Sequence, residues 1–290
     1  MSPRDHMLGY AGEMVRLVNG RLHGLLDEIS PPPLRTPMLH ALEGGKRIRP
    51  LLALASCAAA GGHESDALDA ASAIELLHAA SLVHDDIMDG SDLRRGRPSV
   101  QAAFGVPAAV LAGDAMIALS FRSIRRTRGP NRERILQEFE EAFLVTCEGQ
   151  AEDLGLSAAA PADGDAHRET ARRKTAKLLE ACAAIGALAA AADDSAVQLL
   201  RRFALHLGMA YQMRDDLLDA LGDEAVTGKP AGQDARNGRT TFLTANPAER
   251  VSALVDQHTR SACTTLDSLP AAPAREHLRS LAGSLAGRAA

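Results

Sequence analysis

Apolar and polar residues follow one another along this chain with the period of a helix rather than that of a strand. Residues 8–30, for example, interleave charged residues such as Glu13 and Arg21 with apolar ones, which predicts an amphipathic helix. Strand-like alternation is rare, and no Asn-Gly pair is flanked by strand-like runs. The pattern therefore predicts an all-α fold.

Proline positions divide the chain into stretches that can be long helices, because proline is costly inside a helix. Four prolines between Pro31 and Pro37 predict a hinge after the first helix, and Gly61-Gly62 predicts a break further on. Ser157–His167 is small and polar, which predicts a surface loop. Proline-free stretches cover residues 51–97, 131–160 and 162–229. We expect one domain, residues 1–290, formed by a bundle of about ten helices.

The composition agrees with a helical core of small side chains. Apolar residues make up 46% of the 290 positions but aromatic residues only 3%, so the core should consist mainly of Ala and Leu, which are strong helix formers. The net charge of −5, without a basic stripe, argues against nucleic acid as a partner.

No targeting or metal-binding cysteine pattern is present in the sequence. The cysteines are scattered without a Cys-x-x-Cys pair, which argues against zinc and against a disulfide framework. We see no signal-peptide pattern and no apolar run near the roughly 20 residues that span a bilayer. We therefore expect no transmembrane segment and a cytoplasmic protein.

The most informative feature is an acidic pentapeptide that occurs twice in helix-forming surroundings. Asp85-Asp86-Ile87-Met88-Asp89 is echoed by Asp215-Asp216-Leu217-Leu218-Asp219. Residues i and i+4 share one face of a helix, so each motif directs two or three carboxylates the same way. Gly90 should end the first helix, placing its acids at the partly negative helix C-terminus.

Carboxylates held so close repel one another unless cations lie between them. Magnesium suits such clusters, because it binds a few carboxylates and completes its shell with water and substrate phosphates. The two motifs therefore predict a magnesium-dependent site for a polyphosphate substrate.

Cationic and glycine-rich segments suited to phosphate accompany the acidic motifs. Alone, each of them is more typical of a solvated surface or an ordinary loop. They are Gly44-Gly45-Lys46-Arg47-Ile48-Arg49-Pro50, Arg94-Arg95-Gly96, Gly149-Gln150-Ala151-Glu152-Asp153, Lys174-Thr175, and the loop that contains Gly228-Lys229.

Taken together and in this order, over residues 44–241, these segments resemble the motifs of the all-trans isoprenyl diphosphate synthase family. The resemblance implies a bundle of mostly antiparallel helices around a deep central cavity, with the acidic motifs facing each other across its mouth. It also implies the magnesium-dependent, head-to-tail joining of isopentenyl diphosphate to an allylic diphosphate, with a homodimer as the usual assembly.

The resemblance assigns roles residue by residue. Asp85, Asp89 and Asp215 would bind magnesium directly, and Asp86, Asp216 and Asp219 would complete the first and second shells of three ions. The allylic diphosphate would be held with the help of Arg94, Lys174 and Lys229. Isopentenyl diphosphate would be held by Lys46, Arg49, His78 and Arg95, and Thr175 and Gln212 would lie near the developing cation.

Two positions depart from the family pattern. Tyr211 stands where Phe is common, and Arg239 stands where Lys is common, which keeps the charge of a substrate-binding residue but changes its geometry.

Product length should depend on the helix before the first motif. There Ala80 and Ser81 are small, and in the family bulky aromatics at these positions stop the chain early, so we expect a product of twenty carbons or more. The floor of the cavity could come from Leu77 or Ile74, or from Phe139 and Phe143, which could equally be ordinary core.

Other functions remain open at this point. A farnesyl diphosphate synthase differs only in product length. A class I terpene cyclase shares the fold but normally has a different second metal motif and no isopentenyl site. A regulatory subunit of a heteromeric synthase usually loses acidic motifs, whereas both are intact here.

Overall fold

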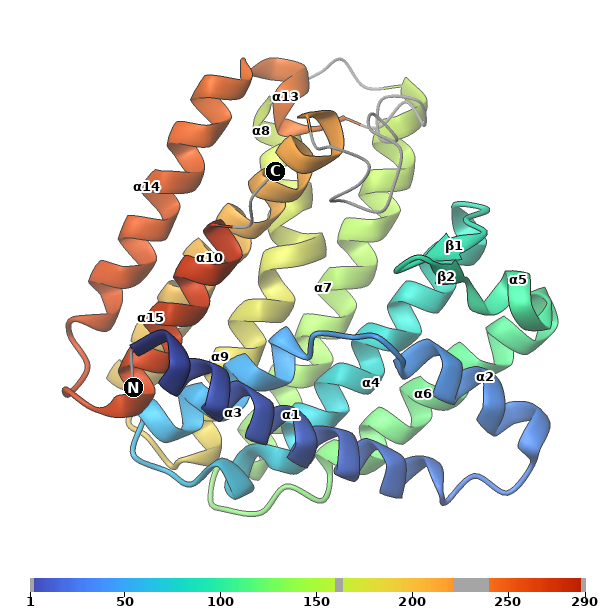
Figure 1. Cartoon of the computed structure of the whole chain (residues 1–290), viewed down its shortest axis with the longest axis horizontal. Helices are drawn as coiled ribbons and strands as arrows, with labels where there is room; N and C mark the ends of the chain where they lie inside the picture. Colours follow the sequence, from blue (N-terminus) through green and yellow to red (C-terminus); the bar gives the residue numbers. More distant parts are fainter. Residues whose placement is uncertain (1–2, 160–163, 222–239, 288–290) are drawn as a thin grey trace.

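The computed structural model describes residues 3–159, 164–221 and 240–287. Nearly all of them are helical, which confirms the all-α prediction (Figure 1). In chain order the elements are α1 (Pro3–Leu26), α2 (Pro32–Leu42), α3 (Ile48–Ala59), α4 (Glu64–Met88), β1 (Leu93–Arg94), β2 (Arg97–Pro98), α5 (Val100–Phe104), α6 (Val106–Ile124), α7 (Arg132–Ala159), α8 (Gly164–Ala171), the π-helical turn η1 (Arg172–Ala176), α9 (Lys177–Ala189), α10 (Asp194–Leu221), α13 (Phe242–Ala245), α14 (Ala248–Leu266) and α15 (Pro273–Ala286).

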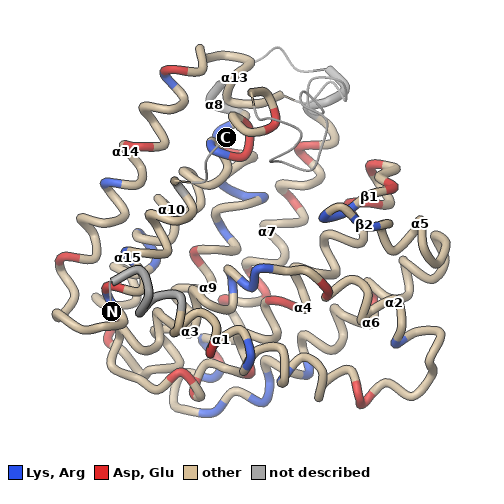
Figure 2. Tube along the Cα trace, viewed as in Figure 1, with Lys and Arg blue, Asp and Glu red and all other residues tan. Residues whose placement is uncertain are grey.

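The long helices pack against one another around a core of small aliphatic side chains. Helix α3 contacts both α4 and α9, α9 contacts α7 and α10, and α14 runs alongside α10 (Figure 1). The main core is dominated by Ala and Leu, with Phe139 and Phe203 among its few large side chains. A second, smaller cluster joins α10, α13 and α14 around Phe242 and Leu217. Acidic and basic residues are mixed along the trace (Figure 2).

Two of the predicted loops are shorter in the structure. Pro32 and Pro33 begin α2 instead of forming a hinge, because the first turn of a helix needs no N–H partner, and Pro37 is accommodated inside the same helix. The predicted loop at residues 157–167 is also shorter than expected, because α7 continues to Ala159 and α8 starts at Gly164. The break at Gly61-Gly62 is confirmed, between α3 and α4.

Helix α6 is apolar and long enough to cross a membrane by length and composition alone, so the expectation of no such run does not hold. Close to half of it is buried inside the molecule (44%), and it packs against α4 and α2. Core helices of soluble proteins pass the same test, so this feature decides nothing about location.

Candidate active site

The first acidic motif lies at the C-terminal end of α4, as predicted. The helix ends at Met88, and Asp89 caps it with helical backbone angles. Asp85 and Asp89 are four residues apart and share a face of the helix. Burial raises the pKa of Asp85, and the charges of Asp89 and Asp86 raise it further, while Lys174 and Arg94 oppose the shift. Asp86 and Asp89 therefore lie close enough to disfavour the charged form of Asp85, which fits a site that needs cations.

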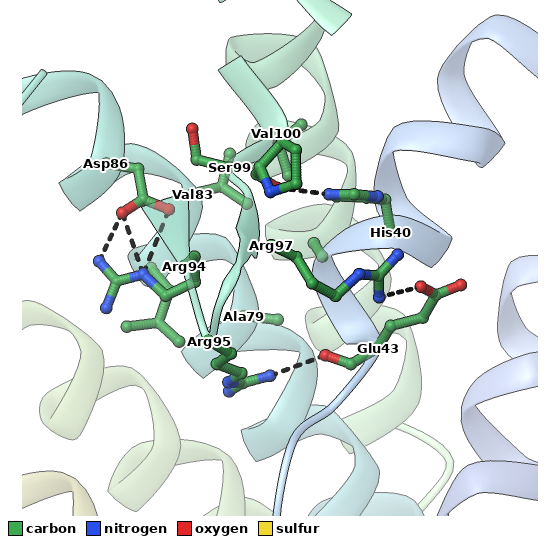
Figure 3. Close-up of a pocket in the computed structure, with 13 residues that line it drawn as sticks. His40, Glu43, Ala79, Val83, Asp86, Arg94, Arg95, Arg97, Ser99 and Val100 are labelled. Atoms are coloured by element: carbon green, nitrogen blue, oxygen red, sulfur yellow. Dashed lines mark hydrogen bonds and ion pairs between the residues drawn. The ribbon is translucent and has the colours of Figure 1, made fainter. Parts of the chain in front are cut away.

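A β-hairpin directly follows the first motif. Arg94 pairs with Arg97 across the ladder, so Arg95 and Gly96 form a two-residue turn. Both turn residues have positive φ angles, +55° and +71°, which is the signature of a type I′ turn and explains the glycine. The hairpin separates its arginines: Arg94 reaches back to Asp86, whereas Arg95 donates to the carbonyl oxygen of Glu43 (Figure 3).

Asp86 and Arg94 form the contact that ties this hairpin to α4. Arg94 Nε lies 3.0 Å from Oδ1 and 3.3 Å from Oδ2 of Asp86, and Nη2 lies 2.5 Å from Oδ1. Asp86 is only 3% exposed. A pocket between α2, α4 and the hairpin is lined by both residues, and by Ala79 and Val83 on the same stripe of α4 (Figure 3).

A cationic cluster forms where the α2–α3 segment meets the hairpin. Arg49 Nη1 lies 2.9 Å from His78 Nε2. Burial lowers the pKa of His78 well below its ordinary value, and the charges of four arginines lower it further, those of Arg49, Arg95, Arg94 and Arg47. Burial also lowers the pKa of Arg95. The structure thus brings together three of the four residues that sequence motifs assign to isopentenyl diphosphate; the fourth, Lys46, is exposed in the same segment.

Arg47 behaves differently from its two cationic neighbours in the sequence. It adopts a left-handed backbone conformation (φ +54°) and is buried. Its guanidinium donates to Glu75 Oε1 at 2.8 Å and to Asn19 Oδ1 at 2.8 Å. The charge of Arg47 is therefore used inside the fold, and the motif gave no signal that Glu75 would neutralise it.

Lys174 and Thr175 lie in the π-helical turn η1, an irregularity often found at functional sites. Lys174 Nζ lies 2.6 Å from Asp153 Oδ2, so the Gly-Gln-x-x-Asp and Lys-Thr motifs meet. The charge of Lys174 also acts on the pKa of Asp85, which places it near the first acidic motif. Thr175 Oγ1 donates to Gln212 Oε1 at 2.7 Å, which joins the turn to α10.

Two glycines allow neighbouring helices to approach this turn. A Cβ atom on Gly149 of α7 would lie 2.5 Å from the backbone nitrogen of Lys174. One on Gly208 of α10 would lie 2.6 Å from the Cα atom of Ala176. Side-chain Cβ atoms do not come so close to backbone, so both positions require glycine.

The second acidic motif lies near the C-terminal end of α10. Asp215 and Asp219 share one face at i and i+4, whereas Asp216 is turned away and is 3% exposed. Asp216 accepts hydrogen bonds from Gln212 Nε2 at 2.9 Å and from the backbone N–H of Phe242 at 2.8 Å. His167 Nε2 lies 3.6 Å from the same carboxylate.

The predicted chain-length residues differ in burial. Ser81 shares the face of α4 that carries His78 and Asp85, and its side chain is partly exposed. Ala80 and Leu77 are almost completely buried, at 0% and 2% exposure. Phe139, a candidate for the cavity floor, packs edge-on against Phe121 with ring centroids 5.3 Å apart. Lys229 and Arg239 lie outside the described residues.

The donor set fits magnesium rather than a metal held in a closed protein cage. Within the described parts of the chain, no three His, Cys, Asp or Glu side chains converge on one point. Magnesium is usually bound by one or two carboxylates together with substrate phosphates and water. Asp85, Asp89, Asp215 and Asp219 could supply such carboxylates.

Comparison with known proteins assigns the chain to a family. The polyprenyl synthetase family profile matches residues 31–265. The chain is 37% identical over 238 residues to geranylgeranyl diphosphate synthase of Sulfolobus acidocaldarius, covering 81% of this chain and 72% of that enzyme. This chain therefore belongs to the polyprenyl synthetase family and is a prenyltransferase.

Solved structures agree with this assignment. Geranylgeranyl pyrophosphate synthetase from Pyrococcus horikoshii superposes with a TM-score of 0.93 at 30% identity, over 99% of this chain and 100% of that one. A second similar structure is geranylgeranyl pyrophosphate synthase from Corynebacterium glutamicum, complexed with isoprenyl diphosphate and magnesium. Its TM-score is 0.82 at 26% identity, with 100% of both chains covered.

Proposed function

We propose that this protein condenses isopentenyl diphosphate head to tail with an allylic diphosphate, giving an all-trans polyprenyl diphosphate of twenty or more carbons. The observation that carries the proposal is that Lys174, whose neighbour Thr175 holds Gln212 beside the second acidic motif, is close enough to act on the charge of Asp85 in the first. His78, around which the arginine cluster forms, lies on the same helix as Asp85. This arrangement provides an anion site next to carboxylates suited to magnesium.

Magnesium, bound with the allylic diphosphate by Asp85, Asp89 and Asp215, would stabilise the negative charge of the departing diphosphate. Three ions and the completing roles of Asp86, Asp216 and Asp219 remain predictions. Lys174 and Arg94 add positive charge where that negative charge develops. Lys229 and Arg239 remain predicted substrate-binding residues.

The arginine cluster would hold isopentenyl diphosphate through Arg49, Arg95 and Lys46, with His78 as a neutral hydrogen-bonding partner. The C–O bond of the allylic substrate breaks, its electron pair leaves with diphosphate, and the isopentenyl double bond attacks the resulting allylic cation. Loss of one proton to the released diphosphate restores a double bond. Thr175 Oγ1 and Gln212, which hold each other, would present oxygen atoms to the cation.

Product length rests on the two small residues about one turn before the first motif. Ala80 and Ser81 lie on α4 below Asp85 and carry no bulky side chain, which supports a tail longer than fifteen carbons. The geranylgeranyl products named for similar enzymes support the same range. A farnesyl diphosphate synthase stays the alternative.

A homodimer is supported by exposed apolar side chains along one helix. Val106, Val110 and Leu111 of α6 are 47%, 39% and 61% exposed, and neighbouring apolar side chains on a surface often mark an interface. A mass of twice 30.5 kDa by light scattering would support the homodimer, and a mass of 30.5 kDa would contradict it.

A cytoplasmic location remains a prediction.

Release of diphosphate from a mixture of both substrates tests the reaction itself. The parent protein should release diphosphate only when magnesium and both substrates are present. Asp85→Asn should slow this release by a factor on the order of 100 or more, because a ligand that stabilises transition-state charge is lost. Release without isopentenyl diphosphate at the same rate would indicate hydrolysis or cyclisation instead.

A further inference from the structure

The π-helical turn η1 interrupts one otherwise continuous helix, because α8 runs directly into it and α9 directly out of it. At its end the N–H of Lys177 donates to the carbonyl oxygen of Arg172, five residues earlier rather than four. The turn packs against α7 on one side and against α10 on the other (Figure 1). Lys174 lies within it, so the shape of this turn decides where the ammonium group of the site is placed.

Arg173, the residue directly before Lys174, connects the turn to two helices. Its Nη1 lies 2.8 Å from Oε1 of Glu152 and 3.7 Å from Oε2 of Glu148, and both glutamates belong to α7. Its Nε donates to Oε1 of Glu169 on α8 at 2.9 Å. Arg173 therefore ties η1 to α7 and to α8 at once.

The carboxylates that hold Arg173 are themselves held. Oε2 of Glu152 accepts a hydrogen bond from Thr170 Oγ1 at 3.3 Å. Both oxygens of Glu169 accept from Arg172, each at 2.8 Å. Hydrogen bonds from Arg172, and then from Arg173, lower the pKa of Glu169 to about 2 against the opposing effect of burial. The network therefore stays charged under ordinary assay conditions.

This network is unsuited to binding substrate phosphates itself. Its three carboxylates outnumber its two guanidinium groups, so the cluster has no excess positive charge. The side chain of Arg173 is 33% exposed, and a single exposed ion pair contributes little, but one guanidinium shared by carboxylates of two helices also fixes geometry. Lys174, by contrast, contacts Asp153 and acts on the charge of Asp85.

We propose that Arg173 is a positioning residue of the active site: with Glu152 and Glu169 it holds the π-helical turn against α7 and thereby places Lys174 beside the departing diphosphate. Arg173 and Glu169 lie outside the segments that the sequence motifs single out, and Glu152 occupies an unspecified position of one. The inference rests on the proposed function, because the role of Lys174 does.

Arg173→Gln and Arg172→Gln are the matched variants that test this role. Each removes one positive charge and each loses contacts with Glu169, but only Arg173 reaches the glutamates of α7. Steady-state kinetics would be measured with each substrate varied in turn. Hydrogen exchange read by mass spectrometry would report on residues 172–177 directly, without substrate or metal.

Arg173→Gln should lower kcat/KM for the allylic diphosphate by a factor on the order of ten, because a small displacement of a catalytic cation is costly. The KM for isopentenyl diphosphate should change by less than about twofold, because that substrate is expected at the arginine cluster around His78. The amides of the turn should exchange faster than in the parent. Arg172→Gln should keep the exchange of the parent and stay within about twofold of its kcat/KM.

A double variant separates action through Lys174 from general damage to the fold. If Arg173 acts by placing Lys174, adding Arg173→Gln to Lys174→Gln should cause no further loss of kcat/KM. Glu152→Gln, which weakens only the α7 side of the network, should reproduce the effects of Arg173→Gln in a milder form.

Equal losses in Arg172→Gln and Arg173→Gln would overturn the inference, and so would unchanged exchange of the turn in Arg173→Gln. Multiplicative losses in the double variant would overturn it as well, because Arg173 would then act independently of Lys174. If the parent elongates no primer, the proposed function fails. Hydrogen exchange still decides in that case whether Arg173 holds the turn, so the two failures are distinguishable.

Discussion

Nε2 of His78 accepts a hydrogen bond from the guanidinium of Arg49, across 2.9 Å. Arginine can only donate, so this ring nitrogen carries no proton and the imidazole is neutral, with its proton on Nδ1. Burial and four neighbouring arginines keep it so, because they lower the pKa of His78. An anion-binding cluster thus includes one uncharged ring that orients a cation.

This neutral imidazole makes stability depend on pH. Because the pKa of His78 is lowered in the folded protein, the unfolded chain takes up the proton more readily. The free energy of unfolding should therefore fall as pH drops below about 6.5, by up to about 1.4 kcal/mol per pH unit, and level off below the folded-state pKa. Urea unfolding between pH 5 and 7 should show a smaller slope for His78→Gln than for the parent.

The exposed His23 of α1 offers the matched control. His23→Gln should keep the slope of the parent protein. Equal slopes for His78→Gln and the parent would show that His78 is not held neutral.

Close packing of α7 against the π-helical turn should make Gly149 intolerant of a side chain. Gly149→Ala places a Cβ against the backbone of Lys174, so we expect a loss of about 1–3 kcal/mol in stability and a clear drop in kcat/KM as Lys174 shifts. Gly155→Ala, on the same helix with nothing within 4 Å, should be neutral or should stabilise by up to about 1 kcal/mol. If both variants behave alike, the close approach has no role.

Lys174 should be needed for its charge, and Asp153 for holding it. Lys174→Gln should lower kcat/KM by a factor on the order of 100, because one cation near the departing diphosphate is lost. Asp153→Asn should cost less, since Lys174 keeps its charge. Lys177, which lies three residues later and 3.9 Å from Glu141, provides the control Lys177→Gln. A loss in Lys177→Gln as large as in Lys174→Gln would contradict the specific role.

Ser81 and Ala80 should both set product length. Ser81→Phe fills space on the face of α4 beneath Asp85, so its product should be shorter than the parent's by at least one five-carbon unit. Ala80→Phe should also shorten the product, and it should in addition destabilise the fold by about 1–3 kcal/mol, since Ala80 is completely buried. Mass spectrometry of the products and thermal melts of both variants separate the two effects. An unchanged product from Ser81→Phe would show that the tail does not pass there.

Much of this architecture could be predicted from the sequence, because its determinants are local. Helical periodicity and the strong helix formers Ala and Leu indicated the all-α fold, and the break at Gly61-Gly62 followed from local backbone preferences. The end of α4 at Met88, with Asp89 as its cap, followed in the same way from Gly90. The prolines gave a wrong prediction where tertiary packing decides the structure. Pro37 was expected in a hinge but is buried inside α2, where packing outweighs one missing hydrogen bond.

The motifs named candidate site residues but could not give their contacts. Motif spacing placed Asp86 and Arg94 among these candidates, yet could not show that they hold each other. Arg47 looked equivalent to Lys46 and Arg49 until the fold placed Glu75 beside it, 28 residues further along the chain. Such pairings depend on which helices meet, and no local pattern encodes that.

Product analysis of the purified chain tests the central claim most directly. The protein would be incubated with magnesium, isopentenyl diphosphate and allylic primers of five, ten and fifteen carbons, with EDTA as the control. We expect one defined all-trans polyprenyl diphosphate of twenty carbons or more, formed only when magnesium is present. A cyclic hydrocarbon, a product that stops at fifteen carbons, or no elongation of any primer would contradict the proposed function.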